Sequence, residues 1–179
     1  MLGGLPPRPA YYPGAAEVYD RHLAAHGRAE VFGKRESGVL PPALLLNVDP
    51  EGDALVFREE PWCPLAAVTM LPGDTPAQYL DRAVAFCNER LAGTLDATLI
   101  VDGETRRQMG PDYDRALAAL RYGTVAVNMW SAAGFIFGAT PWGGFPGHTP
   151  ADIGSGIGFV HNARLVDRVQ KGVVQAPFT

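Results

Sequence analysis

Strand-like and helix-like segments alternate in the middle of this chain, and this pattern constrains the fold most. Apolar runs at 65–71, 95–101 and 124–128 are typical of strands. Between them, residues 75–90 and 112–122 carry apolar side chains at helical spacing. Strands separated in this way favour parallel pairing through right-handed crossover connections. The sequence therefore predicts an α/β fold, with a parallel-strand sheet and crossover helices.

The helix expected over 75–90 has a strong start signal. Thr75 is a good N-cap, Pro76 suits the first helical position, and Gln78 completes a capping box. The side chains expected on its buried face are those of Tyr79, Ala83 and Phe86.

The N-terminal third predicts another helix and two short strands. A helix of about 12 residues is expected after Gly14, with Gly27 as its C-cap. Residues 43–48 suit a strand, and residues 54–57 suit a second strand after the turn at 49–52.

The C-terminal segment ends in a short apolar run. A short helix is expected around 163–169, followed by a strand at 173–178. Pro177 has no N–H to donate to a neighbouring strand. This segment is therefore expected to be an edge strand or an arm.

Composition narrows the classes of partner. The chain has a net charge of -4, and 47% of its residues are hydrophobic and 19% charged. It has neither a basic patch for nucleic acid nor the roughly 20-residue apolar stretch of a membrane span. Two cysteines are too few for a disulfide scaffold, and the Gly- and Pro-rich start is unlike a secretory leader. A cytoplasmic location is expected.

Glycine and proline cluster in loops. The chain has 21 glycines and 16 prolines, with notable clusters at 1–13, 134–147 and 154–158, which indicates specialised loops in a folded domain. The Gly154–Gly158 run is superficially similar to a phosphate cradle, but a structural loop is the favoured interpretation. The sequence has neither a dinucleotide-binding glycine motif after a strand nor a Walker phosphate loop.

The cysteines and histidines suggest no independent catalytic or metal site. Cys63 lies close to two glutamates, which would raise its pKa, and Cys87 lies on an amphipathic helix. Both are expected to be passive thiols. The four histidines (His22, His26, His148 and His161) have no metal-ligand pattern. His22 and His26 are expected at the surface. His148 and His161 lie in or beside glycine-rich loops, and nothing else in the sequence supports a substrate contact for them.

Two segments remain as candidates for chemistry. One is the run Glu59–Leu65, with an acidic pair beside a tryptophan and two prolines. The other starts at Asn128, at the end of an expected strand, and continues to the loop Pro141–Gly144. Ligand sites in α/β folds gather at the carboxyl ends of parallel strands. The competing interpretation is that the tryptophans only cover the core.

At these two segments the sequence resembles the aldehyde dehydrogenase superfamily. Members have a Glu-x-Phe-Gly-Pro-type motif before a strand, and Glu60–Pro64 stands in its place. The family's Gly-x-Val-x-Asn strand is matched by Gly123–Asn128, and its Pro-Phe-Gly-Gly loop by Pro141–Gly144. The resemblance extends from about residue 40 to the end. Cys63 in place of the motif's glycine, a longer loop at 129–140 and a different pattern at 145–162 indicate a divergent branch.

The resemblance implies roles for four residues. Glu60 would accept hydrogen bonds from the nicotinamide ribose, and Trp62 would lie beside that ribose, so the implied cofactor is NAD or NADP. Asn128 and Trp142 would contact the aldehyde substrate.

The resemblance also implies an organisation of the chain. Residues 1–170 would form a catalytic-domain-like segment, and residues 171–179 an oligomerisation strand or arm. Homo-oligomers would form through 171–178.

The family's catalytic Cys, its Glu base and its Rossmann domain lie upstream of the matched region. The chain alone is therefore expected to be inactive, although its family oxidises aldehydes to carboxylic acids. A non-catalytic assembly module is the alternative, and a hydrolase that uses Cys63 is a third.

Overall fold

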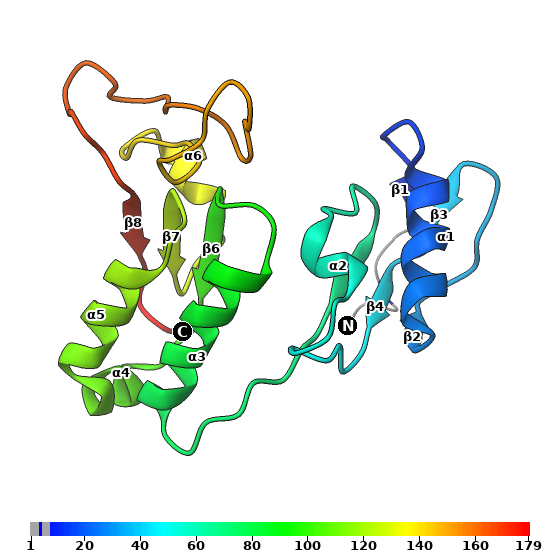
Figure 1. Ribbon diagram of the computed structural model, residues 1–179, viewed down its shortest axis with the longest axis horizontal. Coiled ribbons are helices and arrows are strands. Elements are labelled where there is room, and N and C mark those ends of the chain that lie inside the picture. Colours follow the sequence, from blue (N-terminus) through cyan, green and yellow to red (C-terminus); the bar gives the residue numbers. More distant parts are fainter. Residues whose placement is uncertain (1–3, 5–7) are drawn as a thin grey trace. The chain divides into compact units, whose positions relative to one another are not determined.

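The computed structural model describes residue 4 and residues 8–179, and the chain forms two compact units (Figure 1). Unit 1 extends to Pro72 and includes Arg90–Ala92; unit 2 comprises Gly73–Glu89 and Gly93–Thr179. The expected boundary at residue 170 does not coincide with a boundary between these units. Residues 171–179 are part of unit 2.

Unit 1 contains two small sheets and two helices. Its elements in chain order are β1 (Arg8–Pro9), α1 (Ala15–His26), β2 (Ala29–Val31), β3 (Val39–Leu40), β4 (Ala43–Leu45), α2 (Leu55–Arg58) and β5 (Leu65–Ala67). Strands β1 and β3 pair antiparallel. The other sheet has the order β2-β4-β5, in which β4 pairs antiparallel with β2 and parallel with β5.

Local signals predicted α1 correctly, but they failed at residues 54–57. Helix α1 covers the expected residues, and Gly27 ends it with φ 69° and a bond from its N–H to the Leu23 carbonyl. Residues 55–58 form the one-turn helix α2, so the predicted strand was wrong. A four-residue apolar run is equally compatible with a strand and a buried helical turn. Here the tertiary position of Phe57 decides, because its side chain is buried and its carbonyl accepts from Ala92 N–H at 2.7 Å.

Helix α1 supplies the core of unit 1. Ala15 and Tyr19 pack with Leu40 and Ala43 of the two sheets. His22 lies on the same buried face and is only 1% exposed. The prediction that this histidine is at the surface was therefore wrong.

Unit 2 is a three-stranded sheet covered by helices. Its elements are α3 (Pro76–Arg90, with only Arg90 in unit 1), β6 (Asp96–Leu99), α4 (Gly103–Met109), α5 (Pro111–Ala119), β7 (Thr124–Val127), α6 (Ala133–Phe137) and β8 (Gly172–Gln175). The strand order is β6-β7-β8, and both pairs are parallel.

The α/β class is confirmed, whereas one expected sheet through all the strands is not formed. Strands β6 and β7 pair in parallel across the α4–α5 connection, as predicted. The strand before α3, β5, instead pairs with β4 in unit 1. The expected crossover from 65–71 to 95–101 was therefore wrong, because these segments belong to different sheets.

Strand β7 is the centre of unit 2. All four of its residues are fully buried. Val125 and Val127 face a core built by α3, α4 and α5, which includes Leu80, Met109 and Tyr113. Side chains alternate along a strand, so Thr124 and Ala126 face the opposite side. There α6 covers the sheet, and a Cβ added at Gly134 would lie 2.9 Å from the Thr124 side chain.

Helix α3 begins as predicted but buries a different face. The Thr75 hydroxyl accepts from Gln78 N–H at 3.3 Å, and the Gln78 side chain accepts from Asp74 N–H at 3.1 Å. Leu80 and Val84 are buried along with Phe86, whereas Tyr79 is 48% exposed. The apolar positions allow two adjacent helix faces, and packing against α5 and β7 selects between them.

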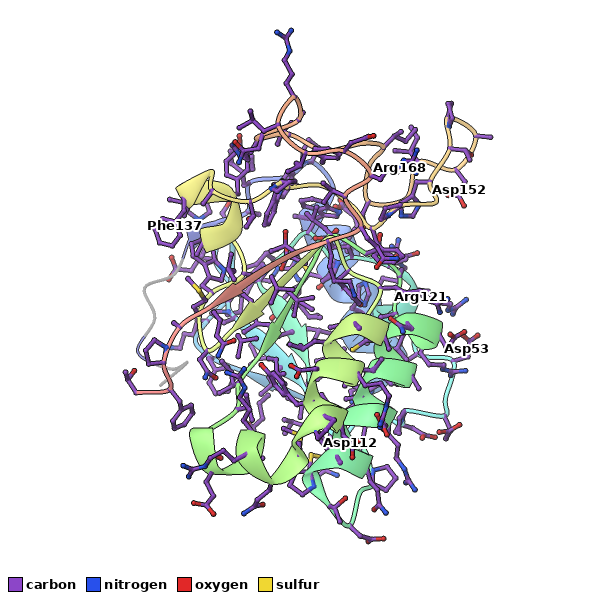
Figure 2. The ribbon with its side chains drawn as sticks, turned by 90° about the vertical axis from the view of Figure 1, so that its left-hand side faces the viewer. Asp53, Asp112, Arg121, Phe137, Asp152 and Arg168 are labelled. Atoms are coloured by element: carbon purple, nitrogen blue, oxygen red, sulfur yellow. The ribbon has the colours of Figure 1, made fainter. Side chains whose placement is uncertain are left out.

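The chain from α6 to β8 is almost entirely irregular. The short helix expected at 163–169 is not formed: residues 163–165 form a turn, and residues 166–169 are irregular. Phe137 lies on α6, and its side chain is 68% exposed (Figure 2). Strand β8 is an edge strand, as predicted from Pro177.

Candidate functional site

Glu60 and Trp62 lie in one pocket on unit 1. The loop between α2 and β5 carries both residues and forms one wall. Tyr11, Tyr12 and Ala15, from the start of α1 and the segment before it, form the other wall. The cavity is open and has a volume of about 450 Å³.

Trp62 has an unusual backbone conformation. Its φ angle is 45°, in the left-handed region, which is rare for a bulky side chain. Its indole ring is 54% exposed and meets the Tyr12 ring edge to face, with centroids 4.9 Å apart and planes at 67°. The Tyr12 ring meets the Tyr11 ring in the same way, at 5.0 Å and 89°. We call these three rings the aromatic corner.

The two adjacent glutamates have different environments. Glu59 forms an ion pair with Arg21, and its carboxylate lies 3.9 Å from Nε2 of buried His22. Glu60 is exposed, and among the described residues none pairs with its carboxylate. Only Glu60 of the two lines the pocket, so its charge is available to a ligand.

The two cysteines lie in apolar surroundings. Cys63 packs beside the core of unit 1, and Cys87 beside the core of unit 2. Burial raises the pKa of both thiols. The cause at Cys63 is desolvation and not the neighbouring glutamates that the sequence suggested. Both environments disfavour the thiolate that a nucleophile needs.

Asn128 lies at the carboxyl end of β7, as expected, and its side chain is bonded within unit 2. Oδ1 accepts from Val101 N–H at 2.8 Å, and Nδ2 donates to Val101 O at 2.9 Å and to Ala176 O at 3.5 Å. These contacts occupy both N–H groups of the amide and leave one lone pair of Oδ1 for a ligand. The substrate-binding role of Asn128 stays a prediction.

Trp142 lies near the opposite end of the same strand. Its ring packs on Phe135 of α6 at 5.7 Å, and its backbone pairs with Val160 in both directions. A Cβ on Gly134 would contact both Trp142 and Thr124, the first residue of β7. The structure thus does not bring Trp142 next to Asn128, because the whole length of β7 separates them.

A second cavity, of about 210 Å³, lies in the glycine-rich loops of unit 2. Backbones approach closely there: a Cβ on Gly123 would lie 1.8 Å from Gly143 O, and one on Gly143 would lie 2.3 Å from Gly158 O. Gly123 directly precedes β7, so this cavity is at the amino end of the strand. Glycine clustering in the sequence indicated these loops, but not their packing into one cavity.

Two side chains anchor the glycine loops. His148 Nε2 lies 2.8 Å from the Thr94 hydroxyl, and the Ser155 hydroxyl accepts from Thr94 N–H at 2.7 Å. These bonds favour a structural role for the 154–158 run, as the sequence suggested. His148 is half-buried.

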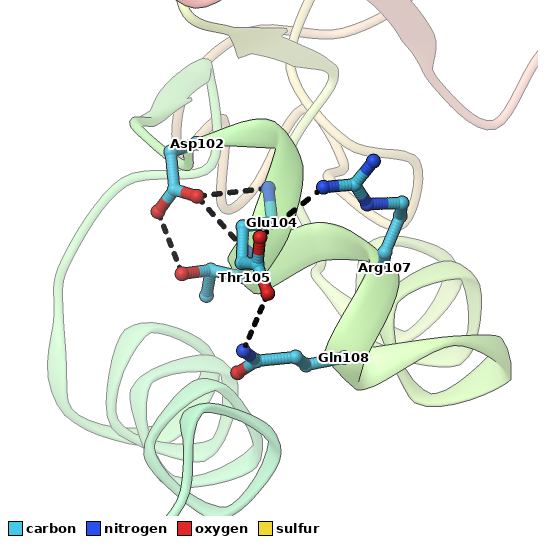
Figure 3. A network of polar contacts seen from close by, with 5 residues as sticks. All are labelled: Asp102, Glu104, Thr105, Arg107 and Gln108. Carbon is cyan, nitrogen blue, oxygen red and sulfur yellow. Dashed lines mark hydrogen bonds and ion pairs between the residues drawn. The ribbon is translucent and has the colours of Figure 1, made fainter.

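Polar residues after β6 form a helix cap and not a site. Asp102 is the N-cap of α4, and its carboxylate accepts from the N–H groups of Glu104 and Thr105, each at 2.9 Å (Figure 3). The Thr105 hydroxyl also donates to it at 2.6 Å. The Thr105 bonds are the main cause that lowers the pKa of Asp102. Glu104 continues the network to Arg107 and Gln108.

Within the described part of the chain, no three His, Cys, Asp or Glu residues are grouped closely enough to hold a metal ion. None of the helices there is long and apolar enough to cross a membrane. The sequence matches no family model and no curated protein.

Proposed function

We propose that this chain is a C-terminal segment of the catalytic domain of an NAD(P)-dependent aldehyde dehydrogenase, from a divergent branch. In this proposal Glu60 and Trp62 bind the nicotinamide ribose of NAD or NADP, and Asn128 and Trp142 belong to the substrate side. The 179 residues alone do not oxidise aldehydes, because neither thiol is activated.

Support comes first from the pocket on unit 1. The Glu60 carboxylate, which has no partner among the described residues, and an exposed indole face the same cavity, as ribose binding beside a nicotinamide ring requires. The carboxylate accepts two hydrogen bonds from a vicinal diol. The raised pKa values of both thiols disfavour the thiolate that a nucleophilic cysteine needs.

The test combines an activity measurement with a binding measurement. We expect no NAD(P)-dependent aldehyde oxidation by the purified chain, and weak, saturable NAD binding that Glu60→Gln weakens about tenfold. Glu30→Gln is the matched control, because Glu30 is an exposed glutamate on β2 of the same unit. Robust aldehyde oxidation, or equal NAD binding by both variants, would contradict the proposal.

The open edge of β8 favours assembly as a second candidate function. Its inner side is bonded to β7 through the N–H groups of Gly172 and Ala176. Hydrogen bonds alternate along a strand, so the N–H groups of Val173 and Gln175 point to the open side. A second copy could pair there, with Val173 (45% exposed) in the contact. In this proposal residues 171–178 make the chain a homo-oligomer.

Removing residues 170–179 is a poor test of assembly, because these residues also stabilise unit 2. The Lys171 ammonium donates to the carbonyls of Leu117, Ala118 and Leu120 and so caps the end of α5. Gln175→Pro removes one outward N–H and leaves the bonds to β7. We expect it to convert a dimer to a monomer in light scattering, whereas Gln175→Ala should stay dimeric. A monomer before any substitution excludes this interface.

A further inference from the structure

The pocket on unit 1 has an aromatic surface that extends beyond Trp62. The Tyr12 and Trp62 planes meet at 67°, so the two rings form adjacent walls and do not stack. Tyr11 continues the surface and is 87% exposed. Rings at such angles present π faces from more than one direction to a ligand in the corner.

The described residues that line the pocket carry negative charge only. Among the described residues that line it, Glu60 is the only one with a charged side chain. Burial raises the pKa of the neighbouring Cys63 thiol and keeps it neutral. The nearby Glu59 carboxylate is neutralised by Arg21. In the described part of the chain, the cavity therefore combines π faces with one unpaired negative charge.

This combination selects for a particular ligand chemistry. An organic cation whose charged nitrogen carries no hydrogen needs no hydrogen-bond acceptor at its charge, and it gains from π faces and from one carboxylate. A primary ammonium needs several acceptors and gains less here. A neutral ring of the same shape gains nothing from Glu60 electrostatically.

The backbone of Trp62 is a second, independent observation. A tryptophan at φ 45° is strained, and glycine, or to a lesser degree asparagine or aspartate, would adopt this backbone at lower cost. Such strain persists where surrounding contacts hold it, and it gathers at ligand sites. The conformation keeps the indole half exposed beside Tyr12 and does not bury it in the core.

We propose that the aromatic corner and Glu60 form a site for organic cations whose charged nitrogen carries no hydrogen, namely N-alkylpyridinium or quaternary ammonium ions. The proposal deepens the proposed function, and it rests on that function for the pyridinium case, because the oxidised nicotinamide ring is an N-alkylpyridinium ion. Tyr12 is then a binding residue that the family resemblance does not assign. The quaternary ammonium case stands without the proposed function.

The test uses the whole chain and three small probes as chloride salts or neutral solutions. The probes are 1-methylnicotinamide, its neutral parent nicotinamide, and tetramethylammonium. The signal is the indole N–H resonance of Trp62, assigned by its loss in Trp62→Phe. We expect 1-methylnicotinamide to shift this signal saturably and to bind at least about fivefold more tightly than nicotinamide.

Variants separate the contributions of charge and ring. Glu60→Gln should weaken binding of both cations about fivefold and leave nicotinamide unchanged. Tyr12→Leu should weaken binding of both cations by a similar factor. Tyr12→Phe keeps an aromatic ring and should bind them as the unchanged protein does. Trp130→Phe, which changes an exposed tryptophan of unit 2, should have no effect. Dispersed amide spectra show that each variant is folded.

The outcomes distinguish this inference from the proposed function. Saturable binding of both cations, or of 1-methylnicotinamide alone, supports the site. If these ions bind but NAD does not, the site stands and the cofactor role fails. Equal affinity for 1-methylnicotinamide and nicotinamide overturns the inference. So does the absence of saturable shifts with both cations, whether or not NAD binds elsewhere.

Discussion

The side chain of Asn128 pairs with the backbone of Val101 as a neighbouring strand would. Its oxygen accepts from Val101 N–H at 2.8 Å, and its nitrogen donates to Val101 O at 2.9 Å. The main chain of Asn128 has already left the sheet, since its φ is 56°. The amide thus continues the β6–β7 ladder after the strands end at Leu99 and Val127.

Replacing this amide should destabilise unit 2. Asn128→Ala leaves the backbone groups of largely buried Val101 without partners, so we expect a loss of about 2 kcal/mol in unfolding free energy. Asn88→Ala is the matched control: Asn88 also accepts from a backbone N–H (Arg121) and donates to a carbonyl (Ala119), but at an exposed site. In Asn88→Ala, water replaces these bonds, so the loss of unfolding free energy should be smaller than in Asn128→Ala. Equal urea midpoints for Asn128→Ala and the unchanged protein would refute the structural role.

Because Trp62 is strained, we expect glycine to stabilise the protein more than alanine at this position, which is the reverse of their order within a helix. Both Trp62→Gly and Trp62→Ala remove the ring, but only glycine adopts φ 45° without a Cβ penalty. We expect the glycine variant to be more stable by about 1 kcal/mol in urea unfolding. At exposed Ala25 within α1, Ala25→Gly should instead destabilise the protein. Greater stability of Trp62→Ala than of Trp62→Gly would show that the strain is absent.

Gly123 is expected to be intolerant of even one added methyl group. In Gly123→Ala the new Cβ would lie 1.8 Å from a backbone oxygen, so the loops around the smaller cavity must move. We expect a destabilisation of about 3 kcal/mol or more. Gly103→Ala is the control, because nothing lies within 4 Å of its added Cβ, and it should be neutral or slightly stabilising. Similar melting temperatures for the two variants would contradict the close backbone approach.

Buried His22 predicts a dependence of unit 1 on pH. Burial is the largest cause that lowers its pKa below 6.5, although Glu59 acts in the opposite direction. Below pH 6.5 the unfolded chain takes up a proton that the folded chain does not, so stability falls as pH falls. The decline should end below the pKa of the folded state.

The measurement compares the unfolding free energy of the His22→Leu variant with that of the protein with His22, by urea unfolding between pH 7.5 and 5. Trp62 fluorescence reports unit 1 in a protein in which Trp130 and Trp142 are replaced by Phe. Below pH 6.5 the unfolding free energy of His22→Leu should fall less steeply with falling pH than that of the protein with His22. The carboxylates contribute equally to both proteins. If the unfolding free energies of the two proteins depend on pH in the same way, groups other than His22 take up the proton.

Local signals predicted the elements of this fold better than their pairing. Gly27 and the Thr75–Gln78 pair predicted the end of α1 and the start of α3 because the bonds involved span only a few residues. The partner of β5 depends on contacts with β4, far earlier in the chain, for which apolar runs carry no signal. The same limit explains the wrong strand at 54–57.

The candidate site was predictable only in part for the same reason. Glu60 and Trp62 are nearly adjacent in sequence, so their common pocket follows from their spacing. The Tyr11–Tyr12 pair precedes α1, and nothing in the sequence pattern relates it to Trp62. The sequence also does not predict the positive φ of Trp62, because Pro61 and Pro64 indicate a turn without specifying the sign of φ within it.

The attachment of β8 has a consequence for the behaviour of the protein at high concentration. A long irregular segment from Gly138 to Lys171 connects α6 to this strand, while the register with β7 needs only four residues. Strand β8 of a second copy offers the same four residues to β7 of the first. An exchanged dimer would therefore repeat the bonds between β7 and β8 of the closed form, and part of the connecting segment would have to change its path. The choice between closed and exchanged forms then depends on protein concentration and on the stiffness of that connection.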